Sequence, residues 1–346
     1  MDLKPAPLTR YFEQRRVEMT EVLPGQRAPL RFTEPRSEHL ATRRAAGLFD
    51  FSFMGCLAIE GPDSIALLHA IQTRNIRQLP VGRIRYTLLL RKNGTVLNDA
   101  TVWRTGEDKY LLFVGRREDL SALVDRSRAF HVRTEERSGE ISVIALQGPR
   151  SRDVLTAALT GCGDLSYYGF AEAKFAGEPC LVARLGYTGE AGYEIVVSAG
   201  RAPALWEALR RAGAAAALQE CGFTAVDTLR IEAGHVLFLN ELALAVTPEE
   251  LGLARLVERK RRAGAAPRRL VGLLPDGPVQ PGAAEEAEAL VTSACRSPLF
   301  DRWIGLGFVP EACRHPGARV QIDANTRGTV ARLPFYASSS RSSSRS

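Results

Sequence analysis

A glycine-rich turn followed by a short strand constrains the fold of this chain more than any other feature. The segment Leu185–Gly192 reads LGYTGEAG, and its three glycines fall within seven residues. Glycines gather in this way where a backbone turns sharply or approaches another group closely. A strand is predicted over Tyr193–Val197, and apolar residues at helical spacing extend over Thr224–Phe238. Tyr187 and Glu190 lie within the turn, so a ring and a carboxylate are held beside these elements.

Short strands and short helices alternate along the rest of the chain. The apolar runs Ile84–Leu90 and Thr95–Trp103 flank Lys92-Asn93-Gly94, and Asn-Gly in this position predicts a β-hairpin. The alternation lacks the regularity of parallel βαβ units, which favours the α+β class. Further strands are predicted over Cys56–Ile59, Tyr110–Val114, Ser142–Leu146 and Cys180–Arg184, and helices within Leu8–Met19, in a stretch ending at Gly47, and over Pro62–Gln72, 117–130 and Ser151–Leu159.

The composition is that of a globular chain of 346 residues with net charge +7. Its basic residues are spread out, and the one dense run, Arg259–Arg262, lacks interleaved aromatic side chains, so we expect no nucleic-acid partner. None of the six cysteines forms a CxxC pair, and we predict neither a metal site nor a disulfide framework. Without a signal core or a membrane-length apolar run, a cytoplasmic location with no membrane partner is expected.

Several separate motifs resemble the glycine cleavage T-protein family, folate-dependent aminomethyltransferases whose relatives include folate-dependent demethylases. The turn and strand GYTGEAGYE, the helix VDTLRIEAG and the segment ALQGP each match the family pattern. Further matches are AGLFDFSFMG near the N-terminus and the hairpin around Asn93-Gly94. The resemblance covers roughly residues 40 to 336 and rests on independent motifs.

The resemblance implies an α+β multidomain fold, in which two ferredoxin-like α+β halves surround a folate channel and a shortened β-barrel follows. The domain boundaries expected from it are an N-terminal extension over residues 1–40, a folate-binding region over 41–258 that divides near residue 145, a linker over 259–269, the barrel over 270–336 and a disordered Ser/Arg tail over 337–346.

The resemblance also implies a transferase that passes a methyl, aminomethyl or methylene group to a nitrogen of tetrahydrofolate. The products would be 5,10-methylene- or 5-methyl-tetrahydrofolate. The donor would be a small molecule, and a carrier protein is a possible partner. No GxGxxG motif follows a strand, so we expect no flavin.

The family matches assign roles to individual residues. Glu194 matches the glutamate that holds the pterin, because a carboxylate pairs with the amino and ring N–H donors of that ring. Tyr187 and Tyr86 match positions that line the folate pocket, and Asp99 matches the catalytic aspartate. Two further folate-binding residues are implied by the same matches, Met54 and Arg230.

Other residues depart from the family pattern. Phe53 replaces a usual histidine, Gly115 replaces an asparagine at the end of the third strand, and Val226 replaces the arginine of a GARD motif. Phe238-Leu239-Asn240 replaces Tyr-Gly-Gln or Tyr-Gly-Glu. His235 is an addition of this chain, and its ordinary pKa suits general acid–base work near neutral pH, so we predict a catalytic role for it.

These departures favour a one-carbon donor other than the lipoyl carrier of glycine cleavage. A glycine-cleavage aminomethyltransferase of a divergent lineage is the first alternative. A non-catalytic folate-binding factor is a second, although HVLFLNEL stands where the iron–sulfur assembly factors carry KGCYxGQE. A repurposed enzyme of secondary metabolism is a third.

Overall fold

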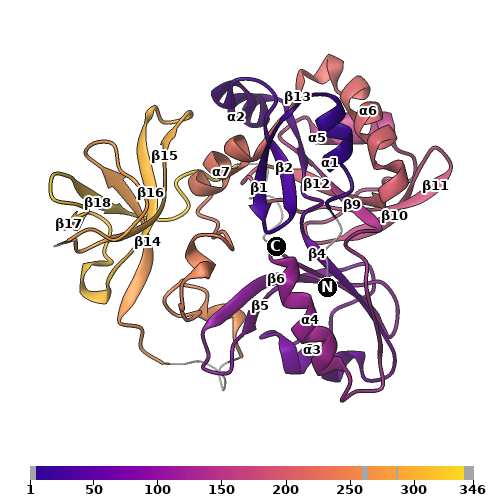
Figure 1. Cartoon of the computed structure of the whole chain (residues 1–346), viewed down its shortest axis with the longest axis horizontal. Helices are drawn as coiled ribbons and strands as arrows, with labels where there is room; N and C mark the ends of the chain where they lie inside the picture. Colours follow the sequence, from indigo (N-terminus) through magenta and orange to yellow (C-terminus); the bar gives the residue numbers. More distant parts are fainter. Residues whose placement is uncertain (1–4, 259–263, 286, 339–346) are drawn as a thin grey trace.

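The computed structural model describes residues 5–258, 264–285 and 287–338. Within this part, the strands form one hairpin and three larger sheets, which Figure 1 shows as three lobes of the molecule. The basic run 259–262, the first half of the expected linker and the Ser/Arg tail from 339 onward lie outside the described residues. No helix in the described part is long and apolar enough to cross a membrane.

The largest sheet carries the glycine-rich turn. In the described residues it has six strands in the order β10-β11-β12-β9-β3-β13. Leu205, Trp206 and Leu209 of helix α6 are fully buried among apolar side chains of this sheet. The strands are β3 (Ala46–Asp50), β9 (Ile141–Gln147), β10 (Phe170–Phe175), β11 (Glu178–Ala183), β12 (Gly192–Ser198) and β13 (Leu218–Glu220), and the helices packed with them are α2 (Pro35–Arg44), α5 (Ser151–Ala158) and α6 (Ala202–Ala212).

The second sheet contains the hairpin that the Asn-Gly pair predicts. Its five strands in the described part follow the order β5-β6-β7-β4-β8. Gly94 adopts a φ of 83° at the turn, a conformation that a side chain would strain. The elements are β4 (Gly55–Glu60), α3 (Ser64–Ile71), β5 (Ile84–Leu90), β6 (Val96–Arg104), β7 (Lys109–Val114), α4 (Leu120–Ser127) and β8 (Arg133–Glu136).

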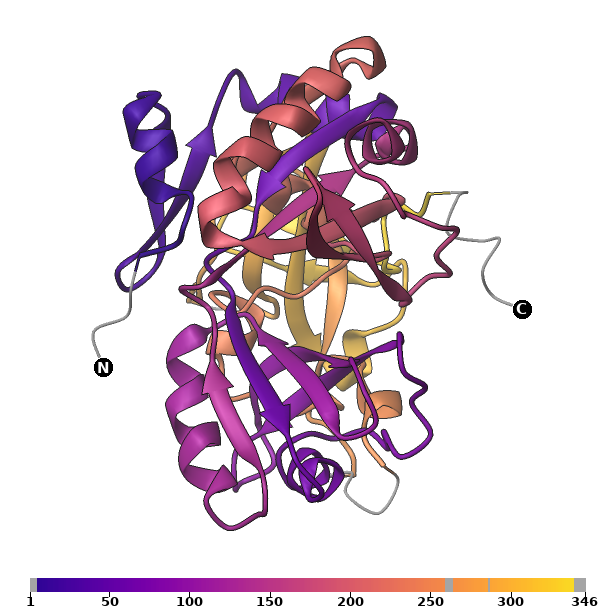
Figure 2. The same cartoon turned by 90° about the vertical axis from the view of Figure 1, so that its right-hand side faces the viewer.

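The N-terminal segment packs against the six-stranded sheet. Leu8 and Phe12 are fully buried, and the Phe12 ring lies 4.9 Å from that of Trp206 in an edge-to-face contact. Figure 2 shows this indigo segment beside α6. It comprises α1 (Thr9–Gln14), β1 (Glu18–Leu23) and β2 (Gln26–Arg31).

The C-terminal sheet is joined to the rest of the molecule by helix α7 (Phe223–Glu232), which contacts α2, β2, β15 and β16. All pairings in this sheet are antiparallel, and its order in the described residues is β15-β16-β14-β18-β17. The strands are β14 (Arg268–Pro275), β15 (Leu290–Ser297), β16 (Arg302–Pro310), β17 (Arg319–Gln321) and β18 (Arg327–Ala331). The α+β class with ferredoxin-like sheets is thereby confirmed.

Some predicted element ends are wrong. Helix α2 ends at Arg44, and Gly47 lies inside β3, where a Cβ atom would collide with the side chains of Thr42 and Phe49. The helical spacing over 224–238 continues past the true helix, because Gly234 adopts a φ of 67° and ends it. His235 therefore lies in the following loop. Only 9–14 of the helical patch 8–19 is α-helix, since β1 follows.

Candidate functional site

The glycine-rich turn packs against the side chain of one buried glutamine, Gln147. Cβ atoms on Gly186 and Gly192 would collide with the Gln147 side chain, so both positions need glycine. Thr188 donates from its hydroxyl to Gln147 Oε1 at 3.1 Å. Gly189 adopts a φ of 88°, which glycine reaches without strain. Close approach and a left-handed backbone thus explain the three glycines.

Glu194 is buried in the strand that leaves the turn. Its neighbours in register are Ala145 on β9 and Ala183 on β11, and these small side chains leave room around the carboxyl group. The residue is 7% exposed. Desolvation is the only influence on its pKa, and no hydrogen-bond partner of its carboxylate is found among the described residues. Burial raises the pKa of Glu194 to about 8. A buried carboxyl group without a partner is costly, and a ligand with matching donors would remove that cost.

Tyr187 connects the turn to the loop after α7. Its hydroxyl donates a hydrogen bond to the carbonyl oxygen of Val236. Its ring stacks on that of His235, with centroids 5.6 Å apart and planes inclined by 18°. Both side chains are half-buried. The two predicted residues are brought together by this contact.

Asp99 and Tyr86 form a pair on neighbouring strands of the hairpin. Tyr86 donates from its hydroxyl to Asp99 Oδ2 at 3.0 Å. Burial raises the pKa of Asp99, and the bond from Tyr86 opposes that rise. Burial also raises the pKa of Tyr187, and the charge of Asp99 adds to the effect. The carboxyl group of Asp99 therefore interacts with both predicted tyrosines, Tyr86 and Tyr187.

Arg230 is fully buried, and its guanidinium donates hydrogen bonds to other groups of this chain. It bonds Asp227 at 2.8 Å, Glu241 at 3.2 Å and the Ser293 hydroxyl at 2.7 Å. It also donates to the carbonyl oxygen of His235 at 3.2 Å. This arrangement fixes the loop after α7 against the C-terminal sheet. A direct contact between Arg230 and folate stays a prediction.

Met54 lies at the edge of an aromatic cluster. It is half-buried and packs against the hydrophobic core that contains Phe53, Phe238 and Val226. Tyr187 packs against the same core. Met54 thus belongs to the surroundings of the turn, and its role towards a ligand stays a prediction.

Comparisons with known proteins identify the family of this chain. Residues 8–261 match the GCVT N-terminal domain, and residues 268–337 match the glycine cleavage T-protein C-terminal barrel domain. The chain belongs to the glycine cleavage T-protein family. The match to the first domain begins at residue 8, well before the limit near residue 40 set by the sequence motifs.

Relatives at high coverage carry the name aminomethyltransferase. The protein of Streptomyces coelicolor is 37% identical over 90% of this chain and 92% of its own length. That of Streptomyces avermitilis is 38% identical, with the same coverage. The crystal structure of the glycine cleavage system aminomethyltransferase T of Bartonella henselae has a TM-score of 0.84 at 29% identity, covering 97% of this chain and 98% of that one. As a family member, this chain is an enzyme that transfers one-carbon groups with folate.

The positions that depart from the family pattern lie together. A Cβ atom on Gly115 would be 2.5 Å from Cδ1 of Phe238, so the Phe238 ring occupies the space where an asparagine side chain would begin. The Phe53 and Phe238 rings lie 6.0 Å apart, and Val226 is buried in the same core. The positions at which the sequence predicts departures from the family pattern therefore share one apolar cluster.

Sequence reasoning missed the buried ionic network that supports the turn from α2. Arg43 donates to Glu190 at 3.0 Å, to Glu232 at 2.7 Å and to the carbonyl oxygen of Thr188 at 2.8 Å. His39 lies 3.1 Å from Glu232. The sequence gives only a weak signal for it, because Arg43 and His39 are ordinary residues of a polar helix.

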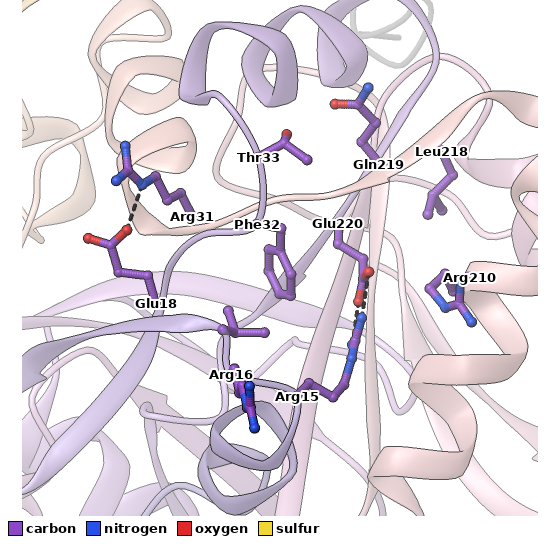
Figure 3. Close-up of a pocket in the computed structure, with 11 residues that line it drawn as sticks. Arg15, Arg16, Glu18, Arg31, Phe32, Thr33, Arg210, Leu218, Gln219 and Glu220 are labelled. Carbon is purple, nitrogen blue, oxygen red and sulfur yellow. Dashed lines mark hydrogen bonds and ion pairs between the residues drawn. The ribbon is translucent and has the colours of Figure 1, made fainter.

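A surface cavity of about 590 Å³ lies elsewhere, between the end of α1 and the short strand β13. Figure 3 shows Arg15 bonded there to Glu220, at 2.6 and 2.8 Å. None of the predicted site residues lines this cavity. Among the described residues, no group of three or more His, Cys, Asp or Glu side chains could hold a metal ion.

Proposed function

We propose that this chain binds tetrahydrofolate with its pterin ring on Glu194 and catalyses one-carbon transfer beside Asp99. The observation that carries the proposal is the Glu194 carboxyl group, which is 7% exposed and has no hydrogen-bond partner among the described residues. A pterin offers a neighbouring amino group and ring N–H that match a carboxylate in bidentate fashion. Tyr187, in the turn just before β12, supplies an aromatic face for the same ring.

Tetrahydrofolate, when bound, supplies the nucleophilic nitrogen that accepts the carbon. Asp99 is suited to hold the proton that this nitrogen loses, because burial raises the pKa of its carboxyl group. Tyr86 orients Asp99 through its 3.0 Å hydrogen bond. His235 is the residue that we propose contacts the donor, and its stacking on Tyr187 supports this role. The nearby apolar core limits the access of water to these groups.

The donor distinguishes two versions of this function. The names of the relatives favour an aminomethyl group, which a carrier protein would present. The packing of Phe238 on Gly115 supports a small-molecule donor, because the expected family pattern has a tyrosine and an asparagine at these two positions. In the first version the product is 5,10-methylene-tetrahydrofolate, and in the second it is 5-methyl-tetrahydrofolate.

The binding proposal is tested by changing Glu194→Ala and titrating tetrahydrofolate in a calorimeter. Removing one partner of a buried, charge-assisted pair costs about 2–5 kcal/mol, so the variant should bind at least tenfold more weakly. Glu172→Ala, an exposed position on β10 of the same sheet, serves as a matched control and should bind normally. Unchanged affinity in Glu194→Ala, or no binding by the unaltered protein, would remove the folate proposal.

A further inference from the structure

The strand that carries Asp99 contains one extra residue shortly before it. The antiparallel pairing of β5 with β6 shifts by one position between Leu89 and Leu90. On β6 the shift falls at Leu97, which the pairing skips, so the hairpin has a β-bulge there. Bulges bend a strand and re-aim the side chains that follow, and they are frequent beside active sites.

The bulge decides which way Asp99 faces. Side chains alternate along a regular strand, so residues three apart face opposite sides of the sheet. Val96 belongs to the apolar core that Tyr86 packs against, and Asp99 bonds the Tyr86 hydroxyl on this same side. Leu97 and Ala100 instead lie in the core that contains residues of α3 and α4. Without the extra residue, the alternation from Val96 would point Asp99 towards that second core.

Groups from the segment after β7 bond to the bulge. The ladder between β6 and β7 ends at the pair of Ala100 and Val114. Beyond this pair, Arg116 donates from Nη2 to the carbonyl oxygen of Leu97 at 2.7 Å. The buried side chain of Asn98 donates in return to the carbonyl oxygen of Arg116 at 3.3 Å. Two side-chain hydrogen bonds therefore continue the connection between the strands where the ladder stops.

Asp119, the residue before α4, joins the same two side chains. It accepts hydrogen bonds from Nδ2 of Asn98 at 2.9 Å and from Nε of Arg116 at 3.2 Å. The side chains of Arg116 and Asp119 are only 19% and 13% exposed. The planar guanidinium is thereby fixed on both of its acceptors, the carboxylate and the Leu97 carbonyl group.

We propose, resting on the proposed function, that Arg116 is a positioning residue for Asp99. It acts through the carbonyl oxygen of Leu97. Its bond keeps the bulge in place, and the bulge keeps the Asp99 carboxyl group on the side of Tyr86. When the bond is removed, the strand is free to take the regular register, which turns the carboxyl group towards the opposite core. A displacement of about 1 Å at a reacting group costs about 10²-fold in rate, so turnover depends on this bond.

The test follows the Asp99 carboxyl group by NMR in protein whose aspartates carry carbon-13 in the side chain. The Asp99 signal is identified by its absence from Asp99→Asn. In the unaltered protein, burial raises the pKa of Asp99 and the bond from Tyr86 opposes that rise. Arg116→Met keeps the apolar stem and removes the donors, so the bond from Tyr86 should be lost and the pKa of Asp99 should rise further. Arg116→Lys, which keeps a charge and a donor, should restore it, and Asn98→Ala should shift it in the same direction as Arg116→Met.

Arg104→Met is the matched control. Arg104 is also half-buried, lies at the other end of β6, and donates to the carbonyl oxygens of Leu79 and Glu107 at 2.9 and 2.8 Å. Its loss should leave the pKa of Asp99 unchanged. An unmoved pKa in both Arg116→Met and Asn98→Ala would overturn the proposal. An equal rise in Arg104→Met would overturn it too, because it would show a general loosening of the sheet.

The NMR readout needs neither folate nor donor, so this inference and the proposed function can fail separately. In Arg116→Met, tetrahydrofolate affinity should stay as in the unaltered protein, because Glu194 lies on a different sheet, while turnover falls by about 10²-fold. Normal turnover in Asp99→Asn would defeat the proposed function. An unmoved Asp99 signal in the variants at positions 98 and 116 defeats this inference alone.

Discussion

The catalytic role proposed for Asp99 depends on the burial of its carboxyl group. This carboxyl group accepts a hydrogen bond from the Tyr86 hydroxyl, and its pKa is raised because it is desolvated. Asp99→Asn keeps the shape and removes the proton acceptor, so turnover should fall by roughly 10²–10⁴ while tetrahydrofolate affinity changes little. Single-turnover kinetics with the true donor, together with calorimetry, measure both quantities. A variant that turns over at the rate of the unaltered protein would show that Asp99 is not the acid–base group.

Glu194 predicts a pH dependence of folate binding. Its pKa, raised by burial to about 8, means that most molecules carry a protonated carboxyl group at neutral pH. If the carboxylate is the form that binds, affinity should rise about tenfold per pH unit up to that pH and then level off. Calorimetry in buffers of different ionisation enthalpy should detect nearly one proton released per ligand at pH 7. A flat affinity between pH 6 and 9 would contradict this.

The same group has a defined effect on the stability of the free protein. Because its pKa is raised on folding, its contribution to stability is fully present below the ordinary glutamate pKa and is lost as pH rises through about 8. Glu194→Gln cannot titrate and should remove the fall in unfolding free energy that Glu194 causes between about pH 4.5 and pH 8.

At the scale of elements, the turn from Gly186 to Gly192 depends on backbone conformation. Gly189 has a φ of 88°, and a Cβ there would lie 2.9 Å from that of Ala233 on the loop after α7. Gly189→Ala should therefore lower the unfolding free energy by about 1–3 kcal/mol. Gly200→Ala, with open space around it and an ordinary φ, is the matched control in a denaturant titration. Equal midpoints for the two variants would show that the turn is not strained.

The elements were predictable where periodicity and turn chemistry act locally. The hairpin around Asn93-Gly94 and the strand after the glycine-rich turn are confirmed, since each has a local signal. The end of α7 was missed because apolar spacing continues through the loop to Phe238, where the side chains are buried by other elements. Local spacing records burial, and burial alone does not distinguish a helix from a packed loop.

At the scale of the whole molecule, Arg43 links α2, the glycine-rich turn and α7. Its guanidinium is bonded to Glu190 and Glu232, and all three side chains are almost completely buried. Arg43→Met leaves both carboxylates without their cation, which costs about 3–5 kcal/mol. Thermal unfolding should show the loss, and Arg44→Met, at the next and exposed position, should unfold like the unaltered protein. An unchanged midpoint in Arg43→Met would mean that the network adds no stability.

Much of the candidate site could be named from motifs, but its assembly could not. The motifs supplied Glu194, Tyr187, Asp99 and Tyr86, and the structure places Tyr86 on Asp99. The contact between Phe238 and Gly115 joins residues more than a hundred positions apart, and no local pattern records it. Turns and hairpins restrict which residues can occupy them, and this restriction produces the motifs. The family could be recognised from those motifs.

The last described residues bear on how the chain is made. Tyr336 donates its backbone N–H to the carbonyl oxygen of Glu232 at 2.9 Å, and its ring lies 4.1 Å from the guanidinium carbon of Arg43. Residue 336 is synthesised well after residue 43, because almost three hundred residues separate them. The guanidinium must therefore wait for its aromatic cover until that length of chain has been made. A nascent chain that has not yet reached residue 336 leaves that face of Arg43 without its aromatic cover.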